Sequence, residues 1–169
     1  NITTFEIPDA KLKKVIEKAF NFPIKMKTLN ENIHVLETFH GPTYTFKDFG
    51  ARFLAYYLEE YLRDSNDKYN ILVSTSGDTG SAIASAFHNI PNMKVTILYP
   101  KDRVSEIQEI QMTTFGKNIV SYCIEDNFDH CQTMVKKTFL DKNIKINIIS
   151  ANSINLGRLL PQSLYYFYA

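Results

Sequence analysis

The sequence predicts an α/β fold in three layers, αβα, with a mostly parallel sheet of about four strands. Four apolar, β-branched runs begin at Ile71, Val95, Ile119 and Ile146. They recur about every 25 residues, which is the length of a strand, a helix and two short loops. Each run is continuous rather than alternating in polarity, as in strands that are covered on both faces. Repeated βαβ units therefore predict a parallel sheet with helices on each side.

The segment before the first of these strands predicts two helices joined by an extended chain. Pro8 and Asp9 precede a short amphipathic helix over about residues 9–20. Residues 21–38 predict an extended connection that ends in a strand. Residues 47–63 place seven apolar side chains on one helical stripe, which indicates core packing. The seven are Phe49, Phe53, Leu54, Tyr57, Leu58, Tyr61 and Leu62.

Three further helices alternate with the four strands. Residues 79–89 follow a Gly-rich turn, and residues 128–141 follow "EDN", whose acids favour a helix start. The helix over residues 105–115 has Ser105 as its expected N-cap and Gln108 three residues later, which is the pattern of a capping box. Each helix therefore has the length that a βαβ crossover needs.

Composition excludes several classes of function. Hydrophobic residues make up 44% of the 169 residues, and 19 basic side chains nearly balance 18 acidic ones. This balance gives no electrostatic support for a nucleic-acid or anionic membrane partner. The longest uncharged internal stretch, residues 146–157, is too short and too polar to span a bilayer. Cys123 and Cys131 have no C-x-x-C spacing and no secretory signal precedes them, so we expect reduced thiols in a soluble, cytoplasmic protein.

Two loops at expected strand ends carry polar side chains, and ligands bind at such ends in open parallel sheets. "STSGDTGSA", residues 74–82, combines glycines and hydroxyls with a helix N-terminus, which suits a carboxylate or phosphate. The alternative is that these residues only cap a helix after a tight turn. "SANSINLGR", residues 150–158, adds Asn152, Ser153 and Arg158, which alternatively are turn residues and a surface charge.

Lys47 lies at the expected start of a helix, between Phe46 and Phe49. A helix N-terminus and apolar neighbours both disfavour the ammonium form and so lower the pKa of a lysine, with Asp48 expected to offset part of that effect. A neutral amine is the nucleophile that Schiff-base chemistry needs. The alternative is a solvated lysine, which is the usual case.

The four histidines show no metal-ligand spacing such as H-E-x-x-H, so we expect no metal site. Only His40 lies close to Lys47 in the sequence.

Three motifs occur in order: "HGPTYTFKDFGARF", "STSGDTGSA" and "NSINLGRLLPQ". Together they resemble the threonine synthase family, in the branch found in enteric bacteria and fungi, which is a member of the fold-type II pyridoxal-phosphate enzymes. The resemblance runs from about Ile7 to Ala169. It implies that the αβα sheet is the small domain of that fold.

The resemblance also implies roles for individual residues. Lys47 matches the lysine that forms the internal aldimine with pyridoxal 5'-phosphate and then shuttles protons on the substrate. Lys47, Phe46 and Asp78 are the implied cofactor-binding residues. The implied substrate-binding residues are Thr75, Ser76, Asp78 and Thr79 for the carboxylate, and Asn152, Ser153 and Arg158 for the phosphate.

The implied reaction converts O-phospho-L-homoserine and water to L-threonine and phosphate by β,γ-replacement. Two alternatives stay open: a related phospho-lyase that eliminates phosphate from the same substrate, and a non-catalytic α/β domain that binds an anion or a protein partner. Product analysis separates the first alternative, and substitution of Lys47 separates the second.

The resemblance divides the chain into three segments. Residues 1–45 are a lead-in of a short helix and an extended connection, and residues 46–155 are the small α/β domain. Residues 156–169 start a helix of a missing large domain, and Pro161 predicts a kink or restart within it. The chain begins without methionine and ends on the aromatic run "SLYYFYA", so we expect a truncated, inactive piece whose aromatic run the large domain covers. The resemblance implies that the family's loop for the cofactor phosphate lies outside these 169 residues.

Overall fold

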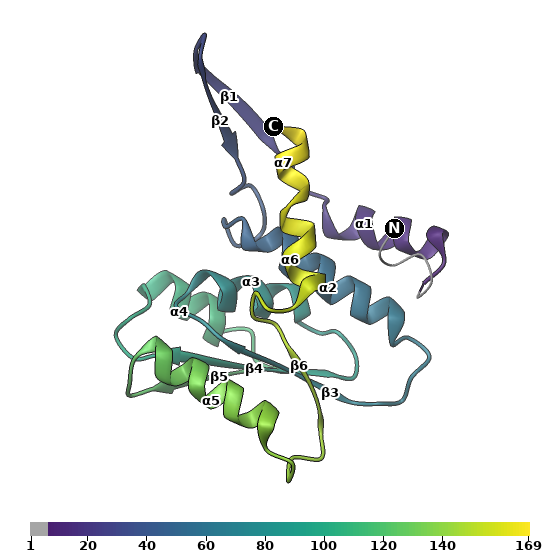
Figure 1. Cartoon of the computed structure of the whole chain (residues 1–169), viewed down its shortest axis with the longest axis vertical. Coiled ribbons are helices and arrows are strands. Elements are labelled where there is room, and N and C mark those ends of the chain that lie inside the picture. Colours follow the sequence, from purple (N-terminus) through teal and green to yellow (C-terminus); the bar gives the residue numbers. More distant parts are fainter. Residues whose placement is uncertain (1–6) are drawn as a thin grey trace.

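The computed structural model describes residues 7–169, which form one parallel sheet covered by helices and one separate hairpin (Figure 1). The helices are α1 (Asp9–Ala19), α2 (Lys47–Tyr61), α3 (Asp78–Phe87), α4 (Glu106–Thr113), α5 (Phe128–Leu140), α6 (Leu156–Gln162) and α7 (Leu164–Tyr168). The strands are β1 (Lys25–Asn30), β2 (Ile33–Glu37), β3 (Tyr69–Ser74), β4 (Met93–Pro100), β5 (Ile119–Ile124) and β6 (Asn147–Ser150). The layer of α2, α3 and α4 lies on one face of the sheet and α5 lies on the other, which confirms the predicted αβα class.

The main sheet has the strand order β5-β4-β3-β6, and its three pairings are all parallel. In the register of the central strand β3, Tyr69 lies opposite Met93 of β4 and Asn147 of β6. The predicted strand runs are therefore confirmed, with ends that differ by one or two residues. Because parallel neighbours end at the same edge of a sheet, the loops that follow β3 and β6 lie side by side.

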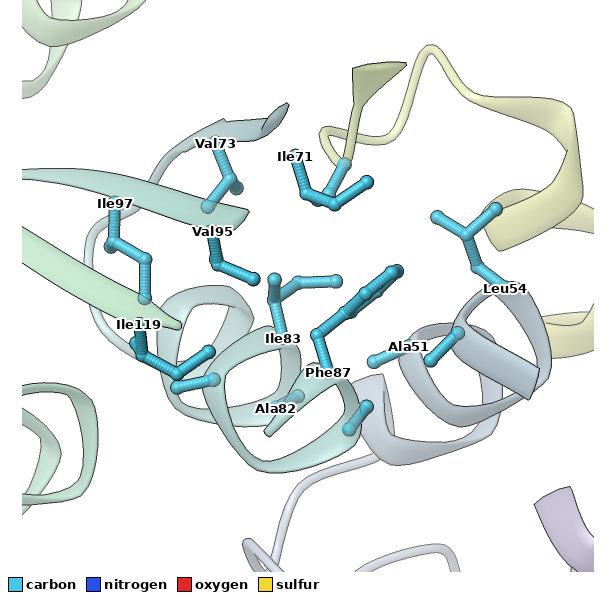
Figure 2. Packing of buried hydrophobic residues seen from close by; sticks show 14 of the residues in the cluster. Ala51, Leu54, Ile71, Val73, Ala82, Ile83, Phe87, Val95, Ile97 and Ile119 are labelled. Carbon is cyan, nitrogen blue, oxygen red and sulfur yellow. The ribbon is translucent and has the colours of Figure 1, made fainter. Parts of the chain in front are cut away.

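The larger core fills the space between the sheet and α3 (Figure 2). Ile71 of β3 and Val95 of β4 pack with Ile83 and Phe87 of α3, all four fully buried. Leu54 of α2 joins the same cluster from the outer helix. Burying side chains of this size contributes about 1.5–3 kcal/mol each, so α3 is held firmly against the strands.

A smaller core lies under α5 on the opposite face. Leu72 and Leu98, which project from β3 and β4, pack against Cys131 and Val135 of this helix. Both cysteines are free thiols: Cys131 is buried here and Cys123 is exposed. The central strands β3 and β4 are thus covered on both faces, as their sequences predicted, whereas the edge strands β5 and β6 keep exposed residues such as Tyr122.

Only part of the stripe expected on α2 is buried. Leu54 is buried, but Tyr61 is 54% exposed. Phe53, Tyr57 and Tyr61 stack in a row along the helix, with ring centroids 5.9 and 6.1 Å apart. Small residues such as Ala51 occupy the side of α2 that packs on α3. The expectation that the whole stripe packs in the core was wrong for Tyr61. The side of α2 in closest contact with α3 bears small side chains such as Ala51, so Tyr61 lies outside that contact.

The lead-in segment forms a β-hairpin, where an extended connection ending in a single strand had been predicted. β1 and β2 pair in antiparallel register, with Lys25 opposite Glu37, and the hairpin projects away from the main sheet (Figure 1). The backbone N–H of Asn32 donates to Asn30 Oδ1 at 3.0 Å and closes the turn. The prediction missed β1 because every residue of this strand is exposed, so no apolar alternation marks it.

Several predicted helix ends are confirmed. The Ser105 and Gln108 pair forms a complete capping box at the start of α4. At the other end of the chain, α6 includes Pro161 and a new helix, α7, starts at Leu164, which is the predicted restart. Within residues 7–169, no helix is both long enough and apolar enough to cross a membrane.

Candidate active site

Three segments meet at the carboxyl edge of the sheet: the loop into α3, the loop into α6, and the start of α2 with Lys47. Two hydrogen bonds join these segments. Thr45 Oγ1 donates to Asp78 Oδ2 at 3.2 Å, and Arg158 Nη2 donates to Thr79 Oγ1 at 3.2 Å. The fold therefore brings four predicted site residues close together: Asp78, Thr79 and Arg158 take part in these bonds, and the charges of Arg158 and Asp78 both act on Lys47.

Lys47 is the first residue of α2 and is half-buried. Its Nζ lies over the ring of Phe46, 3.7 Å from the ring centroid. Burial lowers the pKa of Lys47, the nearby charge of Arg158 lowers it further, and the Asp78 carboxylate partly opposes both. The amine therefore loses its proton more readily than an ordinary lysine, which favours it as a nucleophile.

Asp48 does not offset the pKa of Lys47, and that expectation was wrong. Its buried carboxylate accepts hydrogen bonds from the Thr43 N–H at 2.9 Å and from Thr43 Oγ1 at 2.7 Å. Burial raises the pKa of Asp48, and the Thr43 hydrogen bonds oppose that rise. Successive side chains on a helix point about 100° apart, so Asp48 holds the preceding loop while Asp78, from another segment, acts on Lys47.

The loop between β3 and α3 is shaped by its own backbone contacts. Gly77 has φ 139°, a conformation that residues with a Cβ rarely adopt. Thr75 is buried, and its Oγ1 accepts hydrogen bonds from the N–H groups of Gly77 and Gly80, both at 2.9 Å. Thr75 therefore fixes the turn that presents Asp78, while Ser76 is exposed at the loop surface.

Arg158 is a buried cation in the first turn of α6, with only 3% of its surface exposed. Its Nη1 donates to the carbonyl of Ala151 at 2.8 Å. Burial lowers the pKa of Arg158 to about 10. Among residues 7–169, no carboxylate forms an ion pair with this guanidinium. A buried charge without a counter-ion is costly, so the group is well suited to receive an anion.

Asn152 and Ser153 have different surroundings from Arg158. The Asn152 side chain pairs with the backbone of Ser74: its Nδ2 donates to the carbonyl at 2.8 Å, and its Oδ1 accepts from the N–H at 3.2 Å. Ser153 is exposed and lines, together with α5, a groove of about 570 Å³ to which Arg158 does not contribute. The phosphate-binding roles implied for Asn152 and Ser153 stay predictions.

Two residues of this group had not been predicted as site residues. Thr45 reaches Asp78 from the loop before α2, and Gln108 Nε2 donates to Asp78 Oδ1 at 2.7 Å. The only sequence signal for Gln108 was its place in the capping box. Its second contact depends on how α4 packs against α3, which no local pattern reveals.

The histidines and acids do not gather into a metal site: in the part of the chain that the structure describes, no three His, Cys, Asp or Glu side chains come together. His40 Nε2 instead lies 2.8 Å from Glu37 Oε2. His130 Nδ1 lies 3.0 Å from Asp126 Oδ2 at the start of α5.

The lowered pKa of Lys47 makes a testable prediction about acetylation by acetic anhydride. Because only the neutral amine reacts, Lys47 will acetylate at lower pH than the exposed lysines. Arg158→Met removes a neighbouring positive charge and will raise the pKa of Lys47, so the labelling curve moves to higher pH. Asp78→Asn removes the opposing negative charge and will move it to lower pH. Mass mapping of the Lys47 peptide across a pH series measures both shifts.

Arg52→Met is the matched control for Arg158→Met. Arg52 is also buried, but its Nε donates to the carbonyl of Ala19 at the end of α1. Its substitution will lower stability and leave the Lys47 labelling curve in place. Equal curves for Arg158→Met and the unchanged chain would contradict the electrostatic account.

The chain is similar in sequence to known pyridoxal-phosphate dependent enzymes, among them threonine synthases. Residues 18–155 match the family model described as "Pyridoxal-phosphate dependent enzyme". Threonine synthase of Buchnera aphidicola subsp. Acyrthosiphon pisum is 49% identical over 97% of the chain, and that of Escherichia coli K12 is 46% identical over the same share. The chain spans only 39% and 38% of the length of these two relatives.

Solved structures agree with the sequence relatives. The crystal structure of threonine synthase from Escherichia coli superposes with a TM-score of 0.91 at 44% identity, covering 99% of this chain and 40% of that one. The structure of pyridoxal phosphate-bound threonine synthase from Brucella melitensis gives a TM-score of 0.87 at 37% identity, covering 98% of this chain and 38% of that one. The resemblance found in the three sequence motifs is therefore confirmed.

Proposed function

Since the chain belongs to the pyridoxal-phosphate dependent enzyme family, we propose that it is the lysine-bearing part of a threonine synthase. The reaction is the conversion of O-phospho-L-homoserine and water to L-threonine and phosphate. One observation carries the proposal: the amine of Lys47, whose pKa is lowered by burial and by the charge of Arg158, lies near that buried guanidinium, which has no carboxylate partner among residues 7–169. A nucleophilic amine beside an anion receptor suits a cofactor aldehyde and a phosphorylated substrate.

The residues present fit pyridoxal phosphate. Its aldehyde needs a primary amine that is neutral near physiological pH, and Lys47 is shifted in that direction. Phe46 provides an aromatic ring next to this amine, and Asp78 provides a carboxylate held by Thr45 and Gln108. When bound, the cofactor supplies an electron sink that stabilises negative charge on substrate carbon atoms. Lys47, Phe46 and Asp78 would hold it.

The remaining residues bind the two anionic ends of the substrate. Arg158 receives the phosphate, which leaves from the γ carbon before water adds at the β carbon. Thr79, which the resemblance assigned to the carboxylate, is proposed to bind the phosphate instead, because its hydroxyl accepts a hydrogen bond from Arg158. Ser76 holds the carboxylate at the start of α3, in the turn that the buried side chain of Thr75 fixes. Lys47 Nζ accepts and returns protons as the substrate changes, because an amine of lowered pKa exchanges protons easily near neutral pH.

We also propose that the activity requires more chain than these 169 residues. The relatives are more than twice as long. α7 carries aromatic side chains such as Phe167, which is 86% exposed. An apolar groove of about 460 Å³ lies between α2 and α6, lined by residues that include Phe53, Tyr57 and Leu160. The part of the relatives' fold that follows α7 would cover these surfaces and complete the cofactor site.

Borohydride trapping tests this proposal. The 169-residue chain and the full-length protein are each incubated with pyridoxal phosphate, reduced with borohydride and analysed by peptide mass mapping. We expect modification concentrated on Lys47 in the full-length protein and weak or scattered in the 169-residue chain, which will also form no threonine. Scattered labelling in both would contradict the role of Lys47, and threonine formation by the shorter chain would contradict its expected inactivity. Product analysis of the full-length protein distinguishes threonine from an elimination product.

A further inference from the structure

Gln108 connects the first turn of α4 to the Asp78 carboxylate. Its Oε1 accepts hydrogen bonds from the N–H of Ser105 at 3.1 Å and from Ser105 Oγ at 3.0 Å. Its Nε2 donates to Asp78 Oδ1 at 2.7 Å. The amide orientation follows from these partners, because only its oxygen can accept from an N–H and only its nitrogen can donate to a carboxylate. Both ends of this side chain are therefore engaged.

Gly77 makes this contact possible. A Cβ built on Gly77 would overlap the side-chain amide of Gln108, so only a residue without a Cβ lets the amide pass to Asp78. The φ of 139° at the same residue also excludes other side chains. Gly77 therefore has two roles. It allows the turn, and it leaves room for the Gln108 side chain, which joins α4 to the loop before α3.

The contact continues from Asp78 to Lys47. The other carboxylate oxygen, Oδ2, accepts from Thr45 Oγ1 at 3.2 Å, and Thr45 Oγ1 accepts from the N–H of Lys47 at 3.4 Å. Gln108, Asp78, Thr45 and Lys47 therefore form one chain of hydrogen bonds. Asp78 is exposed, so these two donors are what fixes its rotamer. Without the 2.7 Å contact, the carboxylate keeps only its longer bond on the Lys47 side.

We propose that Gln108 is a positioning residue for the proposed reaction: it orients the Asp78 carboxylate and, through Thr45, the start of α2 that carries Lys47. This inference rests on the proposed function. Gln108 touches neither Lys47 nor Arg158, so it acts only through Asp78. Its capping-box role in α4 is separate, because that role uses its Oε1 and backbone N–H while the positioning role uses Nε2.

Acetylation of Lys47 across a pH series in the 169-residue chain tests the inference without any cofactor. In Gln108→Met, the freed carboxylate moves toward the amine of Lys47, on which it already acts, and stabilises the ammonium form. We expect the Lys47 midpoint to rise by about 0.5 pH units, which is roughly threefold slower labelling below the midpoint. Gln108→Glu keeps the capping box but places two carboxylates together, and we expect a rise in the same direction.

Matched variants separate positioning from helix stability. Ser105→Ala removes the capping box and lowers stability but leaves the contact between Nε2 and Asp78, so we expect the Lys47 midpoint to stay unchanged. Gln108→Met in the Asp78→Asn background will add no shift, because the group through which it acts is gone. Gln108→Glu combined with Asp78→Asn exchanges donor and acceptor, and we expect the midpoint to return toward that of the unchanged chain.

The possible outcomes are distinct. An unchanged midpoint in both Gln108→Met and Gln108→Glu would overturn the inference, as would an equal shift in Ser105→Ala. Borohydride trapping of pyridoxal phosphate in the full-length protein is scored separately. Trapping on Lys47 with no midpoint shift would overturn the positioning role alone. Absence of trapping on Lys47 in the unchanged full-length protein would overturn the proposed function, and the positioning role with it.

Discussion

Lys47→Ala in the full-length protein will lower the rate of threonine formation by roughly a thousandfold or more, because it removes both the nucleophile and the proton carrier. Lys47→Arg will be equally inactive, although it keeps the positive charge at the start of α2, because a guanidinium does not deprotonate near neutral pH. Phosphate release and threonine formation, measured at saturating substrate, give kcat for each variant. Covalent retention of pyridoxal phosphate will be lost in parallel.

Lys68→Ala is the control for these two variants. Lys68 is an exposed lysine that precedes β3. Its substitution will leave kcat and cofactor retention unchanged. If Lys47→Ala retained turnover within tenfold of the unchanged protein, the enzyme interpretation would fail, and the alternative of an anion-binding domain would gain.

Gly50→Ala will have the largest effect on stability among small substitutions near the site, lowering the free energy of unfolding by about 2 kcal/mol. Gly50 lies where α2 packs against α6. A Cβ at this position would overlap the backbone carbonyl of Arg158 and approach Gln162 Nε2 to 2.8 Å. Because a backbone atom cannot rotate away, α6 must move as a unit and take the guanidinium of Arg158 with it. Urea unfolding followed by circular dichroism measures the loss.

The same variant tests the electrostatics of the site. Moving α6 away from α2 increases the distance between Lys47 and the charge of Arg158, which lowers the pKa of Lys47, so the Lys47 acetylation curve of Gly50→Ala will move to higher pH. Gly116→Ala is the control: Gly116 has φ 62°, and no atom lies near the position of its Cβ. This control will cost about 1 kcal/mol through backbone strain and leave the acetylation curve in place. Unchanged stability in Gly50→Ala would contradict the close helix contact.

The sheet could be predicted from the sequence because its signals are local and physical. Continuous apolar runs such as those at Ile71 and Val95 mark strands buried on both faces, and their spacing leaves room for one crossover helix. The capping box of Ser105 and Gln108 is equally local, since four residues contain all its partners. The hairpin strand β1 was missed for the opposite reason, because it has no buried face to leave a pattern.

Only part of the candidate site could be predicted from the sequence. The topology of parallel strands places the loops that bear Asp78 and Arg158 at one edge of the sheet. Lys47 also lay in a motif, but its position depends on how α2 packs against α3 and α6. The partners of each group could not be predicted, because they depend on side-chain directions. Asp48 follows Lys47 directly and yet faces Thr43. Burial and Arg158 lower the pKa of Lys47, and the carboxylate that opposes them is that of Asp78, thirty-one positions away.

The pairing of the Asn152 side chain with the backbone of Ser74 has a consequence for the dimensions of the site. The amide of Asn152 makes the hydrogen bonds that a backbone peptide group would make. The hydrogen bonding between β3 and β6 therefore extends beyond the last backbone pair, Leu72 and Ser150. The two loops that bear Asp78 and Arg158 consequently start one strand spacing apart, about 4.8 Å. The spacing at which the loops bearing Asp78 and Arg158 leave the sheet is therefore set by hydrogen bonding between peptide groups, and the side chains at the site do not change it.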